Sequence, residues 1–279
     1  MKKYYFLLLS AFILFSCSDD ATEQNTTDPT LLQRIDFYPG TVNERRWFFN
    51  ADGILNEITK ADGTVVQNFS YDTSNRLTNS TLFSSNGTSQ NYTFTYDNNG
   101  FVSSVNGQIV NYDSAQAAYY TGDLTQSYRL TQINSDKLLV YGKTAYHDFD
   151  ENGDSFEIVW DEIMVGYDTN SNLTGYFLND SCHSSTYDNF SNPLRNATLA
   201  ICRAFSFIEN SQWVDGLYNS VNNPLSQNYC SEDPESETYS YTFNANNLPV
   251  TQTRNDYYFG VFENTFTSAK YYYQGDVLP

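Results

Sequence analysis

The sequence predicts an all-β protein whose strands form an antiparallel up-and-down meander, and three observations lead to that class. The chain of 279 residues carries 24 Tyr and 20 Phe, and aromatic side chains fit the half-buried surface of a pleated sheet. Segments between polar turns alternate apolar and polar residues, which is the period of a strand with one buried face. A short turn motif recurs along the chain, so consecutive strands are joined as hairpins.

Residues 1–16 have the layout of an export signal. Lys2 and Lys3 precede an apolar stretch over residues 4–15 that only Ser10 interrupts. This stretch is shorter than the roughly 20 apolar residues that span a bilayer. A basic start followed by a short apolar segment is typical of a signal peptide that is removed from the mature protein.

The signal ends in residues 14–17, Leu-Phe-Ser-Cys, which resemble the lipobox of bacterial lipoproteins. A Cys is needed at this point because its thiolate is the nucleophile that takes the diacylglycerol group. The resemblance implies that cleavage leaves Cys17 as the acylated N-terminus. The alternative is a plain secretory signal followed by an incidental Cys, and Phe15 is bulkier than the residue usual at its position.

Residues 17–29 are polar and acidic and are expected to form a flexible tether ahead of one β-rich repeat domain over residues 30–279. The run over residues 18–20, Ser-Asp-Asp, resembles the acidic export signal of surface lipoproteins of the Bacteroidetes. That resemblance implies a lipid-anchored protein of the outer membrane that faces the cell surface. If the acidic run is incidental, the same anchor would hold the domain in the periplasm.

The charge balance excludes nucleic acid as a partner. The chain has 33 acidic against 14 basic residues and a net charge of -19, whereas phosphate backbones are bound by clustered Lys and Arg. Removal of residues 1–16 also takes away Lys2 and Lys3, which leaves 12 basic residues and a net charge of -21. Because so acidic a chain is repelled by an anionic surface, the lipid on Cys17 must do the anchoring.

The recurring motif is an aromatic residue, then Asp or Asn, then a short polar stretch and an aliphatic residue. Copies occur at residues 49–53, 71–77, 96–102, 149–153, 167–173 and 243–248, with a looser copy at 187–194 and a fragment at 112–113. We expect the aromatic ring to end a strand and pack on the facing strand. The Asp or Asn that follows can accept the amide hydrogens of its own turn.

A second set of turns lies between neighbouring copies, at residues 62–63, 86–87 and 106–107, which are Asp-Gly or Asn-Gly. These pairs fit two-residue hairpin turns in which both central residues have positive φ. The two sets together predict five to six strands between Ile54 and Tyr112. The polar partners that alternate with the aromatic residues are expected to face water; they are Ser70, Thr93, Thr95, Ser240 and Thr242.

The repeats resemble the Tyr-Asp (YD) repeats of Rhs-type proteins. With the lipobox in front, the chain also resembles Bacteroidetes lipoproteins of unknown function with a porin-like β fold, over residues 31–279. This implies a meander that is curled or closed into a barrel-like sheet, and it implies no activity, because fold does not fix function. An open sheet covered by an irregular segment is the other arrangement that we consider.

Residues 196–237 depart from the alternating pattern and predict a helical or irregular insertion that covers or plugs the sheet. This insertion carries Cys202 and Cys230, and Cys182 lies just upstream. Three thiols permit one disulfide and one remaining thiol, and spacing does not decide which two bond.

Three groups of residues invite a chemical interpretation, and each has a structural alternative. Residues 148–154 match the first half of a calcium loop, but position twelve is Val159 instead of a bidentate Glu, and a repeat turn explains most of the same residues. Glu157 and Asp161 flank Trp160, yet on a strand they stand about 13 Å apart, beyond the roughly 5–9.5 Å of paired catalytic acids. His147 and His183 have no nucleophile at recognisable spacing.

These observations predict a non-catalytic, lipid-anchored cell-surface protein that is a binding or structural module, with a protein or a glycan as its ligand. We assign no catalytic, metal-binding or cofactor-binding residue, and Cys17 is the one modified position that the sequence predicts. The alternative is a glycan-binding component or a glycan-processing enzyme of a surface polysaccharide-utilisation system. Exposed aromatic rings would favour glycan binding, and a cleft with two close carboxylates would favour the enzyme.

Overall fold

A computed structural model describes residues 28–279 apart from 115–117, 124–126, 135–136, 150–151, 153–154, 161–163, 179–180, 209–219 and 231–234. Along most of 122–165 and along 176–182 it describes the backbone alone. The predicted signal peptide, Cys17 and nearly all of the predicted tether therefore lie outside the described residues.

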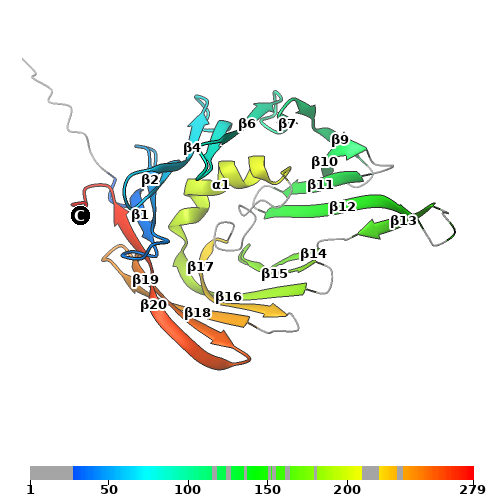
Figure 1. The fold of residues 1–279 in the computed structure, drawn as a ribbon. Helices are drawn as coiled ribbons and strands as arrows, with labels where there is room; N and C mark the ends of the chain where they lie inside the picture. Colours follow the sequence, from blue (N-terminus) through cyan, green and yellow to red (C-terminus); the bar gives the residue numbers. More distant parts are fainter. Residues whose placement is uncertain are drawn as a thin grey trace, which may run out of the picture.

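Nearly all of the described chain is antiparallel β-structure in two sheets (Figure 1). The larger sheet has fifteen strands in the order β14 (Met164–Tyr167), β15 (Leu173–Leu178), β16 (Ser181–Ser191), β17 (Asn222–Cys230), β18 (Glu235–Phe243), β19 (Pro249–Tyr258), β20 (Val261–Tyr273), β1 (Leu32–Phe37), β2 (Arg45–Phe49), β3 (Leu55–Lys60), β4 (Val65–Tyr71), β5 (Leu77–Phe83), β6 (Ser89–Tyr96), β7 (Val102–Val105) and β8 (Gln108–Ile109). The smaller sheet has the order β13 (Ser155–Trp160), β12 (Lys137–Phe149), β11 (Ser127–Asn134), β10 (Ala118–Asp123) and β9 (Asn111–Asp113). Neighbours in both sheets follow one another in the chain except where β20 pairs with β1, which confirms the predicted all-β meander.

The larger sheet curls around the single described helix but does not close into a barrel (Figure 1). The chain passes from β8 to β9 and from β13 to β14, and β10 lies near β8 and β12 near β14. Even so, no ladder between described strands joins the two sheets. The edge strands β8 and β14 have only two and four residues, and such short edges end a sheet without offering a long ladder to a neighbour. The closed form of the predicted barrel is therefore wrong, and the curled form is observed.

Five copies of the aromatic-Asp motif form the same turn, whereas in the looser copy at 187–194 Asp188 accepts only from the amide of Phe190 within its own turn. Oδ1 of Asp97 accepts hydrogen bonds from the amides of Asn99 and Phe101, both at 2.9 Å. Equivalent pairs of bonds to residues two and four positions further on are made by Asn50, Asp72, Asp168 and Asn244. The predicted role of this side chain as an acceptor for its own turn is thus confirmed.

The second set of turns is not uniform, which corrects one prediction. At residues 106–107 both Asn106 (φ 51°) and Gly107 (φ 80°) are left-handed, as a two-residue hairpin turn requires. At residues 62–63 and 86–87 only the glycine has positive φ. The amide of Gly63 donates to Lys60 O at 3.0 Å and the amide of Lys60 donates to Thr64 O at 2.9 Å, which is a three-residue loop with a left-handed last residue. Because Asp62 Oδ1 accepts from the amide of Thr64, this loop is built like the aromatic-Asp turns.

The tyrosine hydroxyls tie each copy of the motif to the one before it. The Tyr71 hydroxyl donates to Leu55 O at 2.5 Å, and the Tyr96 hydroxyl donates to Leu77 O at 2.7 Å. The same bond joins Tyr187 to Leu173 O, and a similar bond joins Tyr273 to Pro249 O. In each case the acceptor is the first residue of a strand that follows a motif turn. A buried phenol thereby satisfies its hydroxyl on a carbonyl at the end of the sheet.

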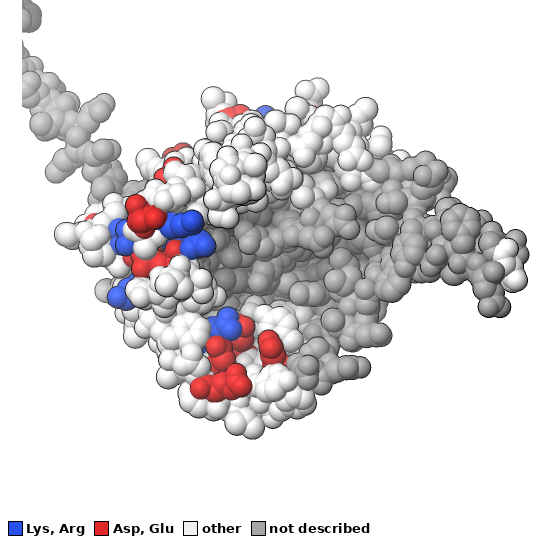
Figure 2. Space-filling model, viewed as in Figure 1, with Lys and Arg blue, Asp and Glu red and all other residues white. Residues whose placement is uncertain are grey.

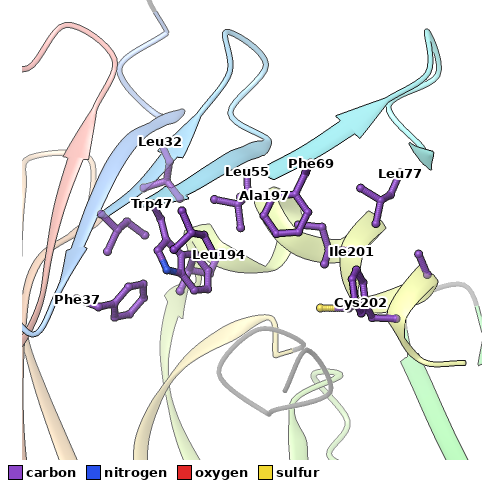
Figure 3. Packing of buried hydrophobic residues seen from close by; sticks show 14 of the residues in the cluster. Leu32, Phe37, Trp47, Leu55, Phe69, Leu77, Leu194, Ala197, Ile201 and Cys202 are labelled. Carbon is purple, nitrogen blue, oxygen red and sulfur yellow. The ribbon is translucent and has the colours of Figure 1, made fainter. Parts of the chain in front are cut away.

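The inner face of the curled sheet carries the core, and the helix α1 (Pro193–Phe205) covers it (Figure 3). Leu55, Leu77 and Val102, the aliphatic residues that follow three turns, are each less than 5% exposed. The buried positions of α1 recur at helical spacing; they are Leu194, Ala197, Thr198, Ile201, Cys202, Ala204 and Phe205. The ring of Phe205 lies 5.4 Å from the ring of Phe94 on β6, centroid to centroid. The helix therefore belongs to the core of the sheet and is not an appendage.

The predicted insertion at 196–237 is confirmed as a helix in its first part and is wrong in its second part. The helix begins at Pro193, where Asn192 caps it by accepting from the amide of Leu194 at 3.0 Å. From Asn222 onward the chain is in β17 and then β18. Pro224 lies within β17, where it faces a bulge in β16 and lies outside the paired part of β17 and β18, a position that proline tolerates.

Two motif turns also hold the chain where it returns to the sheet after α1. Asp168 Oδ2 accepts from Asn172 Nδ2 at 2.9 Å, and Asn172 Oδ1 accepts from the amide of Asn222 at 2.8 Å. The carboxylate of Asp188 accepts from the amide and the side chain of Asn223, at 3.1 and 3.0 Å. Asn172 and Asn223 are 1% and 2% exposed, so their amides are satisfied by these partners and not by water.

The five polar side chains predicted to face water are all exposed or lie on exposed strand positions. They are Ser70, Thr93, Thr95, Ser240 and Thr242. Their aromatic neighbours in the strands, such as Phe69 and Phe94, are buried. One face of each of these strands is therefore polar and the other is aromatic, as the alternation predicts.

Removing the turn acceptor should weaken the fold. We expect Asp97→Ala to lower the free energy of unfolding by about 0.5–2 kcal/mol, as for the loss of a side-chain cap on backbone amides. Asp97→Asn is the matched control, because it keeps Oδ1 and Asn50 and Asn244 perform the same role in this chain. Urea unfolding of the three proteins measures the difference. Melting that depends on calcium in the wild type and not in Asp97→Ala would indicate a metal ligand instead.

The buried tyrosines should make the fold sensitive to alkali. Burial raises the pKa above its ordinary value near 10 for a set of inner-face phenols: Tyr71, Tyr96, Tyr239, Tyr241, Tyr271 and Tyr273. In the unfolded chain these groups lose their protons near pH 10, while the folded state keeps them. The free energy of unfolding should then be constant up to about pH 9 and fall as the pH rises through 10. Tyrosinate absorbance should appear together with loss of β circular dichroism, and tyrosinates that form throughout the folded protein at pH 10 would contradict this.

Candidate functional site

Most of the groups singled out in the sequence fall where the structure describes no side chain. Cys17 precedes the described residues, and the group around Trp160 and the calcium-like residues 148–154 are described in part and by backbone alone. His183 is described: it is buried on β16, and its ring makes an edge contact with Tyr229 at 5.0 Å. Within the described residues, no three His, Cys, Asp or Glu side chains gather in a way that could hold a metal ion.

A polar surface that sequence reasoning missed lies on the inner face of β17, β18 and β19. Directly paired residues of an antiparallel sheet lie on the same face. Gln252 pairs with the buried core residue Ala269 on one side and with Tyr241 on the other, so both strands present these residues to the inner face. Side chains two and four positions further along these strands share that face. We call this surface the polar wall; its residues are Gln227, Glu237, Tyr239, Arg254 and Asp256.

The guanidinium of Arg254 lies at the centre of the polar wall. Its Nη2 is 2.7 Å from Glu237 Oε1, and its Nε donates to Asp256 Oδ1. The Tyr239 hydroxyl donates to Gln227 Oε1 at 3.0 Å and also contacts the Glu237 carboxylate. The side chains of Arg254, Glu237 and Asp256 are 23%, 12% and 26% exposed, so each is partly open to solvent while most of it stays packed.

The polar wall carries a formal charge of -1, with one guanidinium between two carboxylates. Burial opposes the charge on Arg254, but the hydrogen bond to Asp256 and the attraction of Glu237 outweigh it and raise the pKa. Burial, followed by the negative charge of Glu237, raises the pKa of the Tyr239 phenol. At neutral pH the guanidinium is therefore charged and already paired, and the phenol keeps its proton.

The polar groups of the wall define the kind of ligand that this surface can accommodate. A guanidinium that two carboxylates already engage has little attraction left for an anion. The wall offers hydroxyl, amide and carboxylate groups, which fit a neutral or cationic ligand rich in hydrogen-bonding groups. Among the wall residues there is no Ser, Cys, Thr or Lys next to a base, the pairing that nucleophilic catalysis needs.

An aromatic hairpin tip continues the inner face beyond the polar wall. Glu235 pairs with Tyr258, two positions past the pairing of Glu237 with Asp256. The side chains at the β19–β20 turn are unusually exposed for apolar groups: Tyr258 39%, Phe259 56%, Val261 66% and Phe262 54%. Phe259 also has φ 48°, which is uncommon for a bulky residue. Phe262 pairs with Tyr257 and so lies on the other face of the hairpin, whereas Tyr258 adds an aromatic ring to the face of the wall.

Figure 2 shows charged side chains gathered in two groups on one face of the molecule. The lower group lies over the part of the sheet that β18 to β20 form; β18 and β19 carry the two carboxylates of the polar wall. The upper group lies over the region of β1 and β2, where the chain also has a buried ion pair. There Arg34 and Asp36, at 2.7 Å and with side chains only 5% and 6% exposed, pair on the face of β1 opposite the core.

The sequence held a signal for the polar wall. Tyr239, Tyr241 and Phe243 alternate on one strand face, and Glu237 occupies the next position of the same series. Arg254 and Asp256 have the same spacing on the following strand. A carboxylate that extends an aromatic row indicates that the row leaves the core. The pairing of the two strands was needed to bring the charges together.

No helix in the described part of the chain has the length and apolar character needed to cross a bilayer.

No family model matches the chain, and no curated protein matches it. Solved structures with similar chains include a porin-like protein from Bacteroides uniformis, with TM-score 0.41 and 12% identity over 88% of this chain and 98% of that one. A porin-like protein from Bacteroides vulgatus matches with TM-score 0.27 and 14% identity over 71% of this chain and 97% of that one. A chain of the TcdB2-TccC3-TEV structure matches with TM-score 0.23 and 14% identity over 81% of this chain and 10% of that one. Likenesses of this degree do not identify a family.

Proposed function

We propose that this chain is a non-catalytic binding protein, anchored through an acylated Cys17 to the bacterial outer membrane and facing the cell surface, whose ligand lies against the polar wall. The observation that carries the binding role is the network of Arg254, Glu237 and Tyr239. These polar groups lie on a face that is otherwise used for the core, and they remain partly open to solvent.

The geometry argues against a purely structural reason for the wall. A partly buried ion pair contributes little to stability, because desolvation offsets most of the attraction. The inner face could be filled by apolar side chains at these positions, as it is at Ile35 and Phe69. Retaining one guanidinium and two carboxylates there instead is explained by recognition of a ligand.

A second candidate is a glycan-binding component of a surface polysaccharide-utilisation system. The specific observation that favours it is that Tyr258 of the aromatic hairpin tip shares a strand face with the polar wall, two positions beyond Asp256. Tyr258 and Phe259 offer ring faces on which a sugar can stack, and the wall offers hydroxyl, amide and carboxylate partners for its hydroxyl groups. The wall does bring two carboxylates close together, because Glu237 and Asp256 pair across the ladder. Both are engaged by Arg254, so the glycan-processing enzyme considered from the sequence is the less favoured alternative.

Binding at the wall is tested by removing single groups from it. On a glycan array, and with the binders then measured by calorimetry, we expect Tyr239→Phe and Arg254→Gln to weaken binding at least tenfold, or about 1.4 kcal/mol. Thr242→Ala is the matched control, because Thr242 lies on β18 but on its exposed face. Binding that both wall variants retain, or that Thr242→Ala loses to the same degree, places the ligand elsewhere.

The proposed anchor is tested at Cys17. An alkyne fatty acid fed to cells should label the wild type and leave Cys17→Ala unlabelled. Protease shaving of intact cells should then remove the folded domain, and replacing Asp19 and Asp20 by Ala should keep lipidation while abolishing surface display. Equal labelling of Cys17→Ala refutes the anchor. A labelled wild type that survives shaving, while a known surface protein is stripped, refutes the surface address.

A further inference from the structure

Two of the cysteines that the sequence left unassigned face each other across a strand pair. The ladder between β16 and β17 pairs Cys182 with Cys230, and the next pairs in the same ladder are His183 with Tyr229 and Ser184 with Asn228. No bulge interrupts the ladder between Cys182 and Thr186. The register is therefore continuous where the two cysteines meet.

Cross-strand pairing sets the distance that a disulfide needs. Directly opposed residues in an antiparallel ladder have Cα atoms about 4.5 or 5.5 Å apart, depending on whether the pair is hydrogen-bonded. Disulfides join Cα atoms that are roughly 4.4–6.8 Å apart. Both kinds of ladder pair lie within that range, so bonding requires no movement of the backbone strands.

The third thiol is placed apart from this pair. Cys202 is fully buried on α1, and its Sγ lies 3.9 Å from Thr198 Oγ1 on the preceding helical turn. Its burial pattern is that of a core residue of the helix, and a buried thiol of this kind acts as a small apolar side chain.

We infer that Cys182 and Cys230 form a disulfide when the folded chain meets a dithiol oxidant, and that Cys202 stays a thiol. The two thiols lose two protons and two electrons as the sulfur–sulfur bond forms. The electrons pass to the disulfide of an envelope oxidant or of oxidised glutathione, which is reduced to two thiols through a mixed disulfide. That the chain meets such an oxidant in the cell rests on the proposed cell-surface location.

The bond would close a loop of roughly 50 residues that contains α1. It would also fix the register of β17, the strand that contributes Gln227 to the polar wall. A slip of one residue in β17 would turn Gln227 and Tyr229 to the other face of the sheet. The disulfide therefore ties the helix that covers the core and the edge of the wall to one strand pairing.

Trypsin separates the three thiols, which allows a direct test. Cleavage after Lys143, Arg195, Arg203 and Arg254 yields peptides 144–195, 196–203 and 204–254, each with one cysteine. The full chain is isolated from the cell envelope and alkylated under denaturing, non-reducing conditions, and a reduced sample is reoxidised with glutathione disulfide in buffer. In both samples we expect 144–195 linked to 204–254 and an alkylated 196–203.

The results test the disulfide independently of the proposed surface location and of the proposed ligand. Alkylated Cys182 and Cys230 after reoxidation, or a linkage to 196–203, overturns the inference. Linkage in buffer supports it, and if the envelope sample is then reduced, the surface location is wrong and not the pairing. The peptide map reads the covalent state alone, so a failure of glycan binding leaves it unchanged.

A measurement of thermal stability shows whether the disulfide belongs to the folded protein or forms by chance during isolation. Reduction of the bond should lower the melting midpoint by about 5–15 °C, from the loop that it closes. Cys202→Ser should keep both the linked peptides and this shift, because its position lies outside the bond. The double variant Cys182→Ser, Cys230→Ser should melt alike with and without reductant. A shift of equal size in that double variant contradicts the assignment.

Discussion

The structure depends on keeping the inner face of a curled sheet dry although the sheet does not close. A closed barrel shields its own interior, but here the ladders stop at the short edge strands β8 and β14. The helix α1 does the shielding instead, with seven buried positions along thirteen residues. Its Phe205 reaches Phe94, and its Leu194 is fully buried. Everything that positions α1 therefore acts on the core as a whole.

The motif turns do that positioning as well as turning the chain. Asp168 and Asp188 accept from amides of their own turns, and they also hold Asn172 and Asn223. Because Asn172 in turn accepts from the amide of Asn222, both turns bind the strand to which the chain returns after α1. A carboxylate that accepts from two or three donors can be buried without leaving a polar atom that lacks a hydrogen-bond partner. Copies of one turn motif thus serve the strand ends across the sheet and, at two places, the helix that covers it.

The sequence predicted the local structure well because the local chemistry is self-contained. An Asp that accepts from amides two and four residues ahead, as Asp97 does, needs no distant partner. The all-β meander followed from such local patterns, and so did an insertion, helical or irregular, from residue 196 onward, where the helix α1 is found. Closure and the strand at 222–230 did not, because both depend on pairings between segments far apart in the chain. Pro224 in particular is acceptable only because β16 bulges opposite it.

The polar wall could not be predicted for a related reason. The alternation in each of its strands predicts one buried face, but the sequence does not say which strand, and in which register, will pair with it. The alternation predicts Tyr239 as a core aromatic residue, and only the pairing of β18 with β19 places Arg254 beside it. The lipid site at Cys17 could be predicted from the sequence, because an enzyme recognises a lipobox as a short local segment that needs no tertiary structure.

The two ends of the β18–β19 hairpin differ in how deeply their polar groups are buried. Near the motif turn, the Tyr241 hydroxyl donates to Pro224 O at 2.9 Å and accepts from Gln252 Nε2 at 2.7 Å. Gln252 Oε1 accepts in turn from Ser268 Oγ at 2.8 Å, and all of these groups lie at least partly buried. Polar side chains can therefore follow the apolar core along the inner face, because each one has a hydrogen-bond partner. These hydrogen bonds let the same two strands continue, two residues further on, into the exposed charges of Arg254 and its carboxylates without leaving a buried group unpaired.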